Sequence, residues 1–575
     1  MLTRLIIRNF KAFRDVEVEL GDRVVFVGPN NSGKTSALQA LALWSTGVRR
    51  WVERRGAGSV PRERAGVTIN RRDLIALPIP SANLLWRDMH VREGVRENGK
   101  TKTRNVLIDV EVGGVDAGKP WHTAIEFDYA NEESFYCRSK LSSSGERLEV
   151  PEAAARVRLA YLPPMLGLAA SEVRLDEGAI AVRIGEGRTA EVLRNLCWSA
   201  FQRTDKRPWQ QIVERMHALF GVTLTEPQYV PERGEIVMAF QKGPIKLDLS
   251  TSGRGQQQTL LLLAHMAANP GSVLLLDEPD AHLEILRQRQ IYDVLTATAQ
   301  ETGSQIIAAS HSEVILNEAA DRDIVIAFLG KPHRIDDRGS QLLKSLKEIG
   351  FDQYLQAEQT GWVLYLEGAT DLAILRGVAN SLGHPARTYL ERPFVHYVAN
   401  QPGKARDHFY GLKEAKSDLV AVALYDRLEQ PLRDDPNLSQ QMWRRREIEN
   451  YVATPEVLRE CARSYGGTQL GALFEAVAVA HMDAAIDKVS GALQVLGKPD
   501  PFGADSKVSD DFLDPVFRDF FTRMGLPEAT MRKTDYHTLT PFLRPEDVDP
   551  EVVEKLDAIV DVANRAAPAG GDENA

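Results

Sequence analysis

Cysteine is scarce in this 575-residue chain: only Cys137, Cys197 and Cys461 occur, and no two of them are close in the sequence. This spacing provides neither a disulfide framework nor a zinc knuckle. Long apolar runs are also missing, because the most apolar stretch, residues 259–268, has ten residues, whereas a membrane span needs about 18–20. The first residues lack the apolar region of a secretory signal. We therefore exclude membrane, secreted and disulfide-rich classes and expect a cytoplasmic protein.

An excess of positive charge is missing too, since 70 Lys and Arg stand against 80 Asp and Glu, a net charge of −10. Any nucleic-acid site must therefore be a local basic patch. One candidate patch lies between residues 49 and 72. Its arginines either bind DNA phosphates or belong to a solvated surface segment. They are Arg49, Arg50, Arg54, Arg55, Arg62, Arg64, Arg71 and Arg72.

A glycine-rich loop lies between an apolar strand and a helix near the N-terminus. Residues 28–35 read GPNNSGKT and fit the pattern G-x-x-x-x-G-K-[ST],. Such a loop lets backbone N–H groups and the helix dipole hold the phosphates of ATP. Lys34 is expected to reach the β- and γ-phosphates, and Thr35 to bind Mg²⁺. The predicted nucleotide-binding residues here are Gly28, Asn30, Asn31, Ser32, Gly33, Lys34, Thr35 and Ser36.

Two adjacent acids follow a second apolar strand. Residues 273–276 read VLLL, and Asp277 and Glu278 come directly after them. Mg²⁺ requires oxygen ligands, which Asp277 supplies directly or through water. Glu278 is placed to polarise the water that attacks the γ-phosphate. The pair therefore predicts ATP hydrolysis.

Two further segments complete a recognisable order of motifs. Residues 250–256 read STSGRGQ and precede a helix, and His311 follows a strand in ASHS. With the loop and the acids above, this order resembles ABC-type ATPase heads over roughly residues 1–330. The opening residues 7–13 (IRNFKAF) resemble the chromosome-maintenance and recombination-repair branch of that family.

This resemblance implies an assembly. In the family, the signature serine and glycines contact the γ-phosphate bound to another subunit, so hydrolysis requires a homodimer or a higher homo-oligomer. Ser252, Gly253 and Gly255 match those positions, and His311 matches the switch histidine that senses the γ-phosphate.

Two family features are absent from the sequence. No glutamine occurs between Gln39 and Gln202, although ABC-type heads usually place a Q-loop glutamine there to coordinate Mg²⁺ and water. Another residue or water must take its place. The stretch also contains no heptad segment long enough for coiled-coil arms, which disfavours a structural repair ATPase.

A second acidic constellation follows residue 360. Glu367 comes directly after the apolar residues 363–366, and Asp426 directly after residues 422–425. Acids at the carboxyl ends of neighbouring parallel strands meet at one edge of the sheet, where open α/β folds have their sites. Carboxylates there can bind one or two metal ions, and the arginines of residues 443–451 can hold a phosphodiester.

Residues 360–455 resemble the Toprim domain of topoisomerases, primases and nucleases. Glu367 matches the glutamate of the first motif, and Asp426 matches the first aspartate of D-x-D, whose second aspartate is replaced by Leu428. Both Glu367 and Asp426 are expected to be catalytic. Asp371, Glu447 or Glu449 are candidates to complete the metal site. The predicted metal ligands are Thr35, Asp277, Glu367, Asp371, Asp426 and Glu449. The alternative is an α/β domain whose acids simply lie at exposed strand ends.

An ABC-type head followed by a Toprim-like domain resembles the OLD (overcoming lysogenization defect) family of bacterial ATP-dependent nucleases. Several members of that family act against phage. The resemblance implies an ATP-controlled, Mg²⁺-dependent endonuclease that acts on DNA, with Mn²⁺ as an alternative metal at the Toprim-like site and a companion defence protein as a potential partner. The alternative is an ATP-switched sensor or scaffold whose Toprim-like domain binds a partner protein.

The predicted fold is α/β, and the length suggests about three domains. We expect an ABC-type P-loop ATPase domain, a Toprim-like Rossmannoid domain and a helical C-terminal region. We also expect residues 46–75, which are basic and contain Gly and Pro, to form a loop. The predicted boundaries are 1–335 for the ATPase domain with a helical insertion at about 185–230, 336–359 for a junction, 360–455 for the Toprim-like domain, 456–566 for the helical region and 567–575 for a disordered tail.

Overall fold

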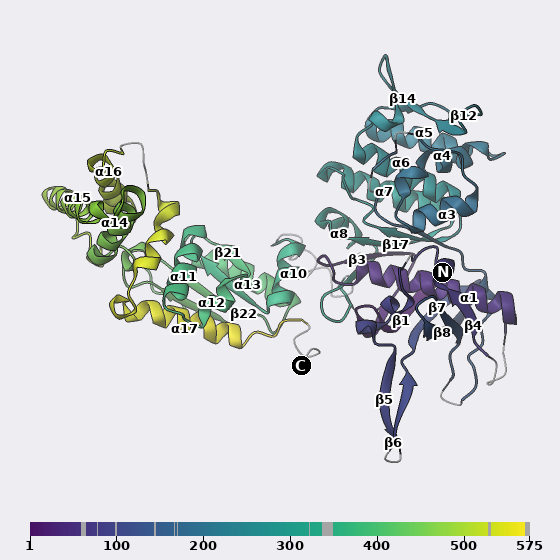
Figure 1. Ribbon diagram of the computed structural model, residues 1–575, viewed down its shortest axis with the longest axis horizontal. Helices are drawn as coiled ribbons and strands as arrows, with labels where there is room; N and C mark the ends of the chain where they lie inside the picture. Colours follow the sequence, from purple (N-terminus) through teal and green to yellow (C-terminus); the bar gives the residue numbers. More distant parts are fainter. Residues whose placement is uncertain are drawn as a thin grey trace. The chain divides into compact units, whose positions relative to one another are not determined.

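The computed structural model describes residues 1–58, 65–77, 79–97, 100–142, 145–165, 167–169, 171–320, 322–335, 349–526 and 531–569 (Figure 1). The chain forms two compact units, Met1–Leu343 and Lys344–Ala575. Their division falls within the predicted junction at 336–359, of which residues 336–348 lie outside the described residues. The second unit contains both the predicted Toprim-like domain and the helical region, so the chain has two units where the length suggested about three domains.

The first unit contains a twisted antiparallel sheet built from segments of alternating apolar and polar residues. Strand β1 (Leu2–Phe10) pairs with β2 (Phe13–Glu19), which confirms the antiparallel pair predicted for the opening residues. The order across the sheet is β2-β1-β7-β8-β9-β4. The other strands are β4 (Val67–Asn70), β7 (Ile108–Asp116), β8 (Lys119–Asn131) and β9 (Ser134–Ser139). A separate hairpin of β5 (Arg92–Glu97) and β6 (Lys100–Asn105) projects from this half (Figure 1).

A second sheet carries the strands of the nucleotide motifs. Its order is β10-β16-β17-β3-β18-β19, and all of its pairs are parallel except the edge pair β18–β19. Strand β3 lies between β17 and β18 and is almost entirely buried, as its continuous apolar run predicts,. The strands are β3 (Arg23–Val27), β10 (Leu159–Leu162), β16 (Val273–Asp277), β17 (Gln305–Ser310), β18 (Ile324–Ala327) and β19 (His333–Arg334).

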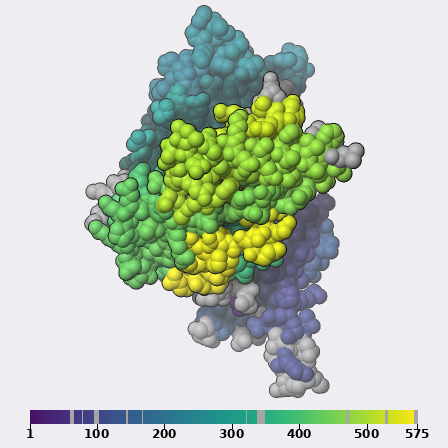
Figure 2. Space-filling view, turned by 90° about the vertical axis from the view of Figure 1, so that its left-hand side faces the viewer, coloured from purple at the N-terminus to yellow at the C-terminus, as the bar shows by residue number. Residues whose placement is uncertain are grey.

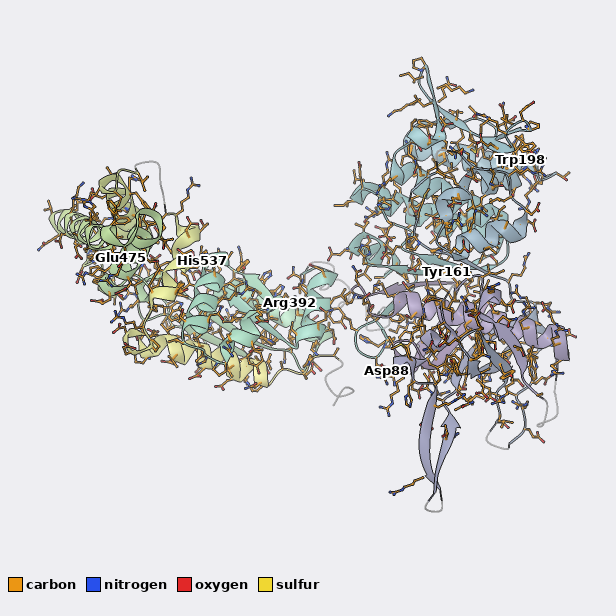
Figure 3. All side chains as sticks on the ribbon, viewed as in Figure 1. Asp88, Tyr161, Trp198, Arg392, Glu475 and His537 are labelled. Carbon is orange, nitrogen blue, oxygen red and sulfur yellow. The ribbon has the colours of Figure 1, made fainter. Side chains whose placement is uncertain are left out.

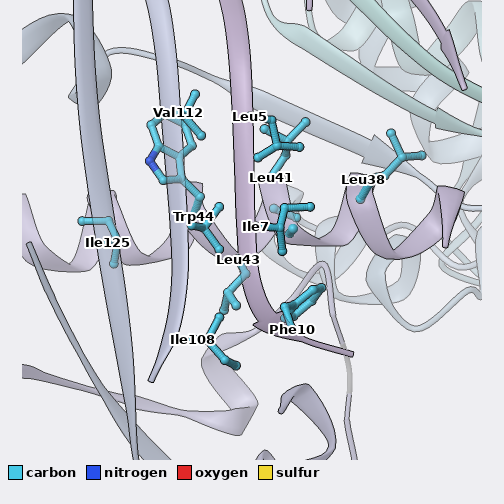
Figure 4. Close-up of a cluster of buried hydrophobic side chains, with 14 of the residues drawn as sticks. Leu5, Ile7, Phe10, Leu38, Leu41, Leu43, Trp44, Ile108, Val112 and Ile125 are labelled. Carbon is cyan, nitrogen blue, oxygen red and sulfur yellow. The ribbon is translucent and has the colours of Figure 1, made fainter. Parts of the chain in front are cut away.

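Helix α1 (Lys34–Arg55) packs against the antiparallel sheet. Figure 4 shows Leu41 and Trp44 of this helix among side chains of β1, β7 and β8. The expectation of a loop from residue 46 was wrong for residues 46–55, which continue the helix. Gly47 suggested a loop because glycine is a poor helix former. In the structure a Cβ on Gly47 would lie 2.9 Å or less from Phe127 and Ile125, so the glycine lets the helix approach β8 closely.

One face of the parallel sheet packs on α1 and the antiparallel sheet, and a layer of helices covers its opposite face (Figure 1). It includes α4 and α5, which lie in the predicted helical insertion at 185–230. Short strands connect the helices at the far end of this layer. The helices are α3 (Glu177–Gly185), α4 (Leu193–Gln202), α5 (Arg207–Phe220), α6 (Arg254–Ala268), α7 (Ile285–Thr302) and α8 (Glu313–Ala319), and α2 (Glu152–Ala155) lies before β10. The short strands are β11 (Thr223–Leu224), β12 (Gln228–Val230), β13 (Glu235–Val237), β14 (Ala239–Lys242) and β15 (Ile245–Asp248).

The second unit is built on a four-stranded sheet of order β21-β20-β22-β23, and all of its pairs are parallel. The strands are β20 (Trp362–Leu366), β21 (Val395–Tyr397), β22 (Val420–Tyr425) and β23 (Leu438–Met442). The helices are α10 (Phe351–Thr360), α11 (Ala369–Ser381), α12 (Ala386–Leu390) and α13 (Pro402–Ala415).

Helices of the C-terminal region share one hydrophobic core with this sheet. They are α14 (Pro455–Leu470), α15 (Glu475–Val495), α16 (Asp514–Arg523) and α17 (Pro550–Asn564). Figure 2 shows the yellow C-terminal segment against the green residues of this unit. Of the predicted tail, residues 567–569 lie on the unit, since the Ala569 N–H donates to the Glu358 carbonyl at 2.7 Å, and residues 570–575 lie outside the described residues. In the described part of the chain, every helix is too short or too polar to cross a bilayer.

Candidate functional site: a P-loop ATPase centre and an acidic sheet edge

The glycine-rich loop has the backbone geometry of a phosphate-binding loop. Gly28 and Gly33 have φ angles of 150° and 101°, and Asn31 has a φ of 64°. Substitution of Gly33 is impossible without movement, because its Cβ would lie 2.7 Å from the ring of Phe13. The loop thus ends directly at the first turn of α1, and the N–H groups of a helix N-terminus can bind an anion.

Lys34 is held inside this loop. Its Nζ donates to the carbonyl oxygens of Gly28 at 2.6 Å and Pro29 at 2.8 Å. Burial lowers the pKa of Lys34, and the nearby Glu278, Asp277 and Asp280 oppose that shift. The ammonium is therefore available at the position that the phosphates of a nucleotide need.

The predicted Mg²⁺ ligands meet across neighbouring elements. The hydroxyl of Thr35, in α1, donates to Oδ1 of Asp277 at the end of β16, with a distance of 3.0 Å. Burial raises the pKa of Asp277, while the hydrogen bonds from Thr35 and Tyr161 oppose that shift,. One hydroxyl and one carboxylate suit Mg²⁺, which completes its shell with water and phosphate oxygens. These two residues would hold the ion.

Tyr161 is a site residue that sequence reasoning missed. It lies on β10, the neighbour of β16, and its hydroxyl donates to Oδ2 of Asp277 at 3.2 Å. Burial and the carboxylate of Asp277 raise its pKa, so it remains a donor. Gln39 contacts the Tyr161 hydroxyl and also accepts from Lys11 at 2.5 Å. Tyr161 therefore takes a place beside the metal ligand in a chain without a Q-loop glutamine.

The two predicted catalytic residues of this centre are brought together. Oε1 of Glu278 lies 3.6 Å from Nδ1 of His311, and both side chains are partly exposed. Glu278 has a φ of 49°, a strained conformation held by the bond from its N–H to the Ala309 carbonyl,. The buried Asp280, also missed from the sequence, accepts from Ser310 at 2.8 Å and so fixes the loop before His311.

The hydrogen bonds of the signature serine are made within its own stretch of the chain. Ser252 donates to the Leu249 carbonyl at 2.7 Å, and Gly253 is the N-cap of α6. Gly253 is exposed and Ser252 half-buried. Gly255 packs tightly under Leu283, because its Cβ would lie 3.1 Å from that side chain. An exposed helix N-terminus of this kind can accept an anion from outside the unit.

The acids of the second unit converge as predicted. Glu367 follows β20 and Asp426 follows β22, and these strands are parallel neighbours. Asn400, which sequence reasoning missed, joins them: its Nδ2 donates to Glu367 at 2.5 Å and to Asp426 at 3.4 Å, and its Oδ1 accepts from the Asp426 N–H at 3.0 Å. Asn400 and Ala399 have φ angles of 57° and 47°, a costly pair of conformations typical of functional sites.

Asp371 and Glu449 surround this pair. Asp371 accepts from the Glu367 N–H at 3.0 Å. Burial first, and then the charge of Glu367, raises the pKa of Asp371 to about 6. Burial and Glu447 raise the pKa of Glu449 to about 7. Burial, and a hydrogen bond that the protonated Asp426 donates to the Glu367 carboxylate, raise the pKa of Asp426 to about 9. Like charges are therefore crowded at this edge.

Lys533 supplies a positive charge to the cluster. Its Nζ lies 3.3 Å from Glu449 and 3.9 Å from Glu447. Burial alone would lower its pKa, but Glu449, Glu447 and Glu367 raise it. Lys533 comes from the distant helical region, so no signal near the acidic motifs could identify it.

The donor set suits a hard metal but does not form a closed cage. The described residues contain no group of three or more His, Cys, Asp or Glu that could hold a metal ion. Glu367 and Asp426 remain as a pair, and Leu428 stands where the resemblance expects a third acid. Mg²⁺ is commonly bound by one or two carboxylates plus water and substrate phosphates. The pair fits that kind of site.

Two of the arginines expected to hold a phosphodiester form surface ion pairs. Arg444 pairs with Glu554 at 2.9 Å, and Arg445 with Asp549 at 3.4 Å. Exposed pairs of this kind are weak, so a role of these arginines in holding a phosphodiester stays a prediction.

The basic patch at 49–72 is likewise partly neutralised. Arg50 pairs with Asp73 at 2.8 Å and Arg71 with Glu133 at 2.8 Å, while Arg62 and Arg64 lie outside the described residues.

We expect the metal-free second unit to lose stability as pH rises from about 4 to 9. The folded-state pKa values of Asp371, Glu449 and Asp426 are raised, so the folded form binds more protons than the unfolded form in that window,. Mg²⁺, which binds the ionised carboxylates, should restore more stability at pH 8.5 than at pH 6. Thermal unfolding at the two pH values measures this. Asp426→Asn should flatten the dependence, and an unchanged slope in that variant would contradict the assignment.

Comparisons with known proteins identify the nucleotide-binding unit. A family model described as "AAA domain, putative AbiEii toxin, Type IV TA system" matches residues 240–317, and one described as "AAA ATPase domain" matches residues 1–49. These segments contain the P-loop, the signature segment, the paired acids and His311. The chain contains an ATPase domain of the AAA/ABC type. Comparison with curated proteins gives no match.

Solved structures with some similarity are heads of Smc proteins. One is "Crystal structure of the SmcHead bound to the C-winged helix domain of ScpA", at 14% identity and a TM-score of 0.33, covering 58% of this chain and 97% of that one. Another is the SMC head domain from Thermotoga maritima, at 16% and 0.32, covering 58% and 98%. A third is the Smc head domain of Pyrococcus furiosus with an extended coiled coil, bound to the C-terminal domain of ScpA, at 14% and 0.34, covering 60% and 99%. Similarities at this level carry no functional argument.

Proposed function

We propose that this protein is an ATP-controlled, Mg²⁺-dependent nuclease that cleaves DNA, and that it serves in defence against phage. The observation that carries the nuclease activity is the pair Glu367 and Asp426, held together by Asn400 at the carboxyl ends of neighbouring parallel strands. This is the sheet edge at which open α/β folds bind their ligands. The ATPase unit supplies the control, and the resemblance to the OLD family suggests both the role in defence and a companion protein.

The chemistry follows from the groups at the edge. Bound Mg²⁺ supplies Lewis-acid activation of water and of the leaving oxygen. Glu367 and Asp426 would hold the ion. Asn400 keeps their oxygens together, and Asp371 fixes the turn after β20 through the N–H groups of Glu367 and Gly368. Lys533 offsets the negative charge that a phosphodiester adds.

The proposed control requires two chains. Ser252, Gly253 and Gly255 lie at the exposed N-terminus of α6, where the family places contacts to the γ-phosphate of another subunit. A nucleotide held between two chains would couple ATP binding to dimer formation. Hydrolysis would then allow the two chains to separate.

Mixing two inactive variants tests this assembly. We expect Lys34→Ala and Ser252→Arg to be nearly inactive ATPases alone, because one lacks the P-loop ammonium and the other blocks the signature. In a mixed dimer one of the two composite sites has both parts intact, so an equimolar mixture should recover up to about a quarter of the wild-type rate, since about half of randomly paired dimers are mixed. Steady-state ATPase assays measure the recovery. Absence of recovery, with exchange shown by labelled subunits, would contradict a shared site.

A second candidate function has its own observation. Lys533 already places a cation against Glu449, and Leu428 leaves the acidic pair without a third ligand. An acidic pair without a third ligand, beside acids that a lysine already partly neutralises, favours an ATP-switched sensor or scaffold that binds a partner protein instead of cutting DNA.

One assay separates the two functions. Supercoiled plasmid is incubated with the full chain, with Mg²⁺, Mn²⁺ or EDTA, and with or without ATP. Nicked or linear product that depends on the metal and changes with ATP supports the nuclease. Intact plasmid under every condition, with ATP turnover demonstrated in the same preparation, contradicts it and leaves the sensor.

A further inference from the structure

A cavity of about 540 Å³ lies within the first unit, between helix α1, strand β10 and helices α3, α4 and α6. This volume is in the range of roughly 300–1,000 Å³ that small-molecule sites occupy. Figure 3 labels Tyr161 at the sheet beside which the cavity opens. Its walls combine apolar and polar side chains. The polar ones are Ser45, Thr46, Arg49, Tyr161, Glu177, Ser199, Arg203, His265 and Asn269.

The buried side chain of His265 indicates that the cavity binds a ligand. The side chain lines the cavity and is 3% exposed. Within the described residues, neither ring nitrogen has a hydrogen-bond partner of normal geometry. Burial lowers the pKa of His265 to about 4, and the backbone of Ala160 opposes that shift only in part. The ring is thus neutral at pH 7, and while one nitrogen faces the Ala160 backbone, the other is unused. An unused buried polar group is costly.

The charged side chains that line the cavity are exposed. Arg49 and Arg203 are cationic, and Glu177 is anionic, so the cations outnumber the anion. Arg203 donates to the Ala267 carbonyl at 2.7 Å, which holds its guanidinium at the rim. Two guanidinium groups suit a phosphate or carboxylate. A ligand for this cavity therefore carries an anion at one end and a hydrogen-bonding edge at the other, which excludes a plain aliphatic tail from the position of His265.

Three elements connect the cavity to the ATP centre. Helix α1 begins at Lys34 of the P-loop, and its residues Ser45 and Arg49 reach the cavity about three to four turns later, roughly 16–22 Å along the helix,. Helix α6 begins at the signature segment and ends beside the cavity at His265. Tyr161 both lines the cavity and donates to Asp277.

From this arrangement we infer that the cavity is a regulatory site for a small heteroaromatic anion of mononucleotide size, whose ring edge bonds His265 and whose anionic group binds Arg49 and Arg203. Occupation would fix Tyr161 and the far ends of α1 and α6, and so change the ATP turnover rate. The ligand acts through differential binding to the states that these elements adopt during hydrolysis. The inference concerns the ATPase unit and stands independently of the nuclease.

The probes are AMP, GMP, CMP and UMP, titrated calorimetrically into the full chain with its P-loop saturated by a non-hydrolysable ATP analogue. We expect at least one of them to bind with one site per chain and to change the ATPase rate at least twofold. Decanoate, an aliphatic anion, should bind at least tenfold more weakly. Failure of all four nucleotides to bind, or equal binding of decanoate, would overturn the inference.

Variants locate the site. Ser199→Trp, which fills the cavity, and Arg49→Glu, which reverses the charge at its mouth, should each weaken binding at least tenfold. Arg54→Glu is the matched control, because it makes the same charge change on an exposed part of α1 away from the cavity. Nucleotide binding that Ser199→Trp and Arg49→Glu leave unchanged would place the ligand elsewhere and overturn the assignment.

His265→Leu separates a ligand group from a structural one. The leucine removes the unused polar atom at similar volume, so the ligand-free variant should unfold about 2 °C higher than wild type while binding the nucleotide at least tenfold more weakly. A lower unfolding temperature together with unchanged nucleotide affinity would show that the imidazole serves packing alone.

Discussion

Replacing Glu278 with glutamine should reduce ATP turnover by about 10²–10⁴-fold while leaving ATP binding intact. The amide keeps the shape of the side chain but cannot accept the proton of the attacking water. Glu278 lies 3.6 Å from His311 and next to the metal ligand Asp277, so it is the carboxylate best placed for this role. Phosphate release measures turnover, and a fluorescent ATP analogue measures binding.

Glu214→Gln is the matched control for this experiment. Glu214 is an exposed glutamate on α5 of the same unit, so its amide should leave turnover within about twofold of wild type. Turnover in Glu278→Gln equal to that of the control would remove Glu278 from the hydrolytic step. Weaker ATP binding in Glu278→Gln would mean that the carboxylate also organises the P-loop.

The parts of the fold that the sequence predicts best are those in which local pattern and burial agree. Strand β3 has a continuous apolar run and is central, and β1 with β2 alternates and forms an edge pair. Residues 46–55 show the opposite case. Gly47 is typical of a loop in the sequence, but in the structure it lies in helix α1 and allows close packing against β8. Close packing between distant segments has no local signal.

The same distinction applies to the candidate sites. Lys34, Thr35, Asp277 and Glu278 lie within contiguous motifs, so their roles can be predicted from spacing. Asn400 and Lys533 reach the acidic edge from segments that carry no motif, and only the three-dimensional fold brings them to Glu367 and Glu449.

Tyr161 is a residue of the nucleotide centre that lies outside every motif. It reaches Asp277 from the neighbouring strand, in a chain whose sequence shows only that the expected glutamine is missing. Sequence motifs thus identify groups that adjoin one another along the chain, whereas partners from other strands and helices require the tertiary structure.

The nuclease proposal predicts that Glu367→Gln and Asp426→Asn lose DNA cleavage by at least about 10³-fold while keeping ATP turnover within about twofold. Each amide removes one of the two charges that would hold Mg²⁺, and a site with only two carboxylates has no spare ligand. Neither residue belongs to the ATPase unit. Asp434→Asn, an exposed aspartate of the same unit, serves as the control. Equal cleavage by Asp426→Asn and the control would exclude Asp426 as a metal ligand.

Leu428→Asp tests the missing ligand in the opposite direction. Leu428 is only half-buried, so a carboxylate there can remain partly solvated,. If a third acid completes the site, the Mg²⁺ concentration needed for half-maximal cleavage should fall severalfold, because each added carboxylate strengthens the binding of a hard cation. Combining Leu428→Asp with Asp426→Asn should abolish that gain, since the new acid extends the existing pair and cannot form a site alone. A metal requirement that stays the same in Leu428→Asp would mean that water and phosphate already complete the coordination.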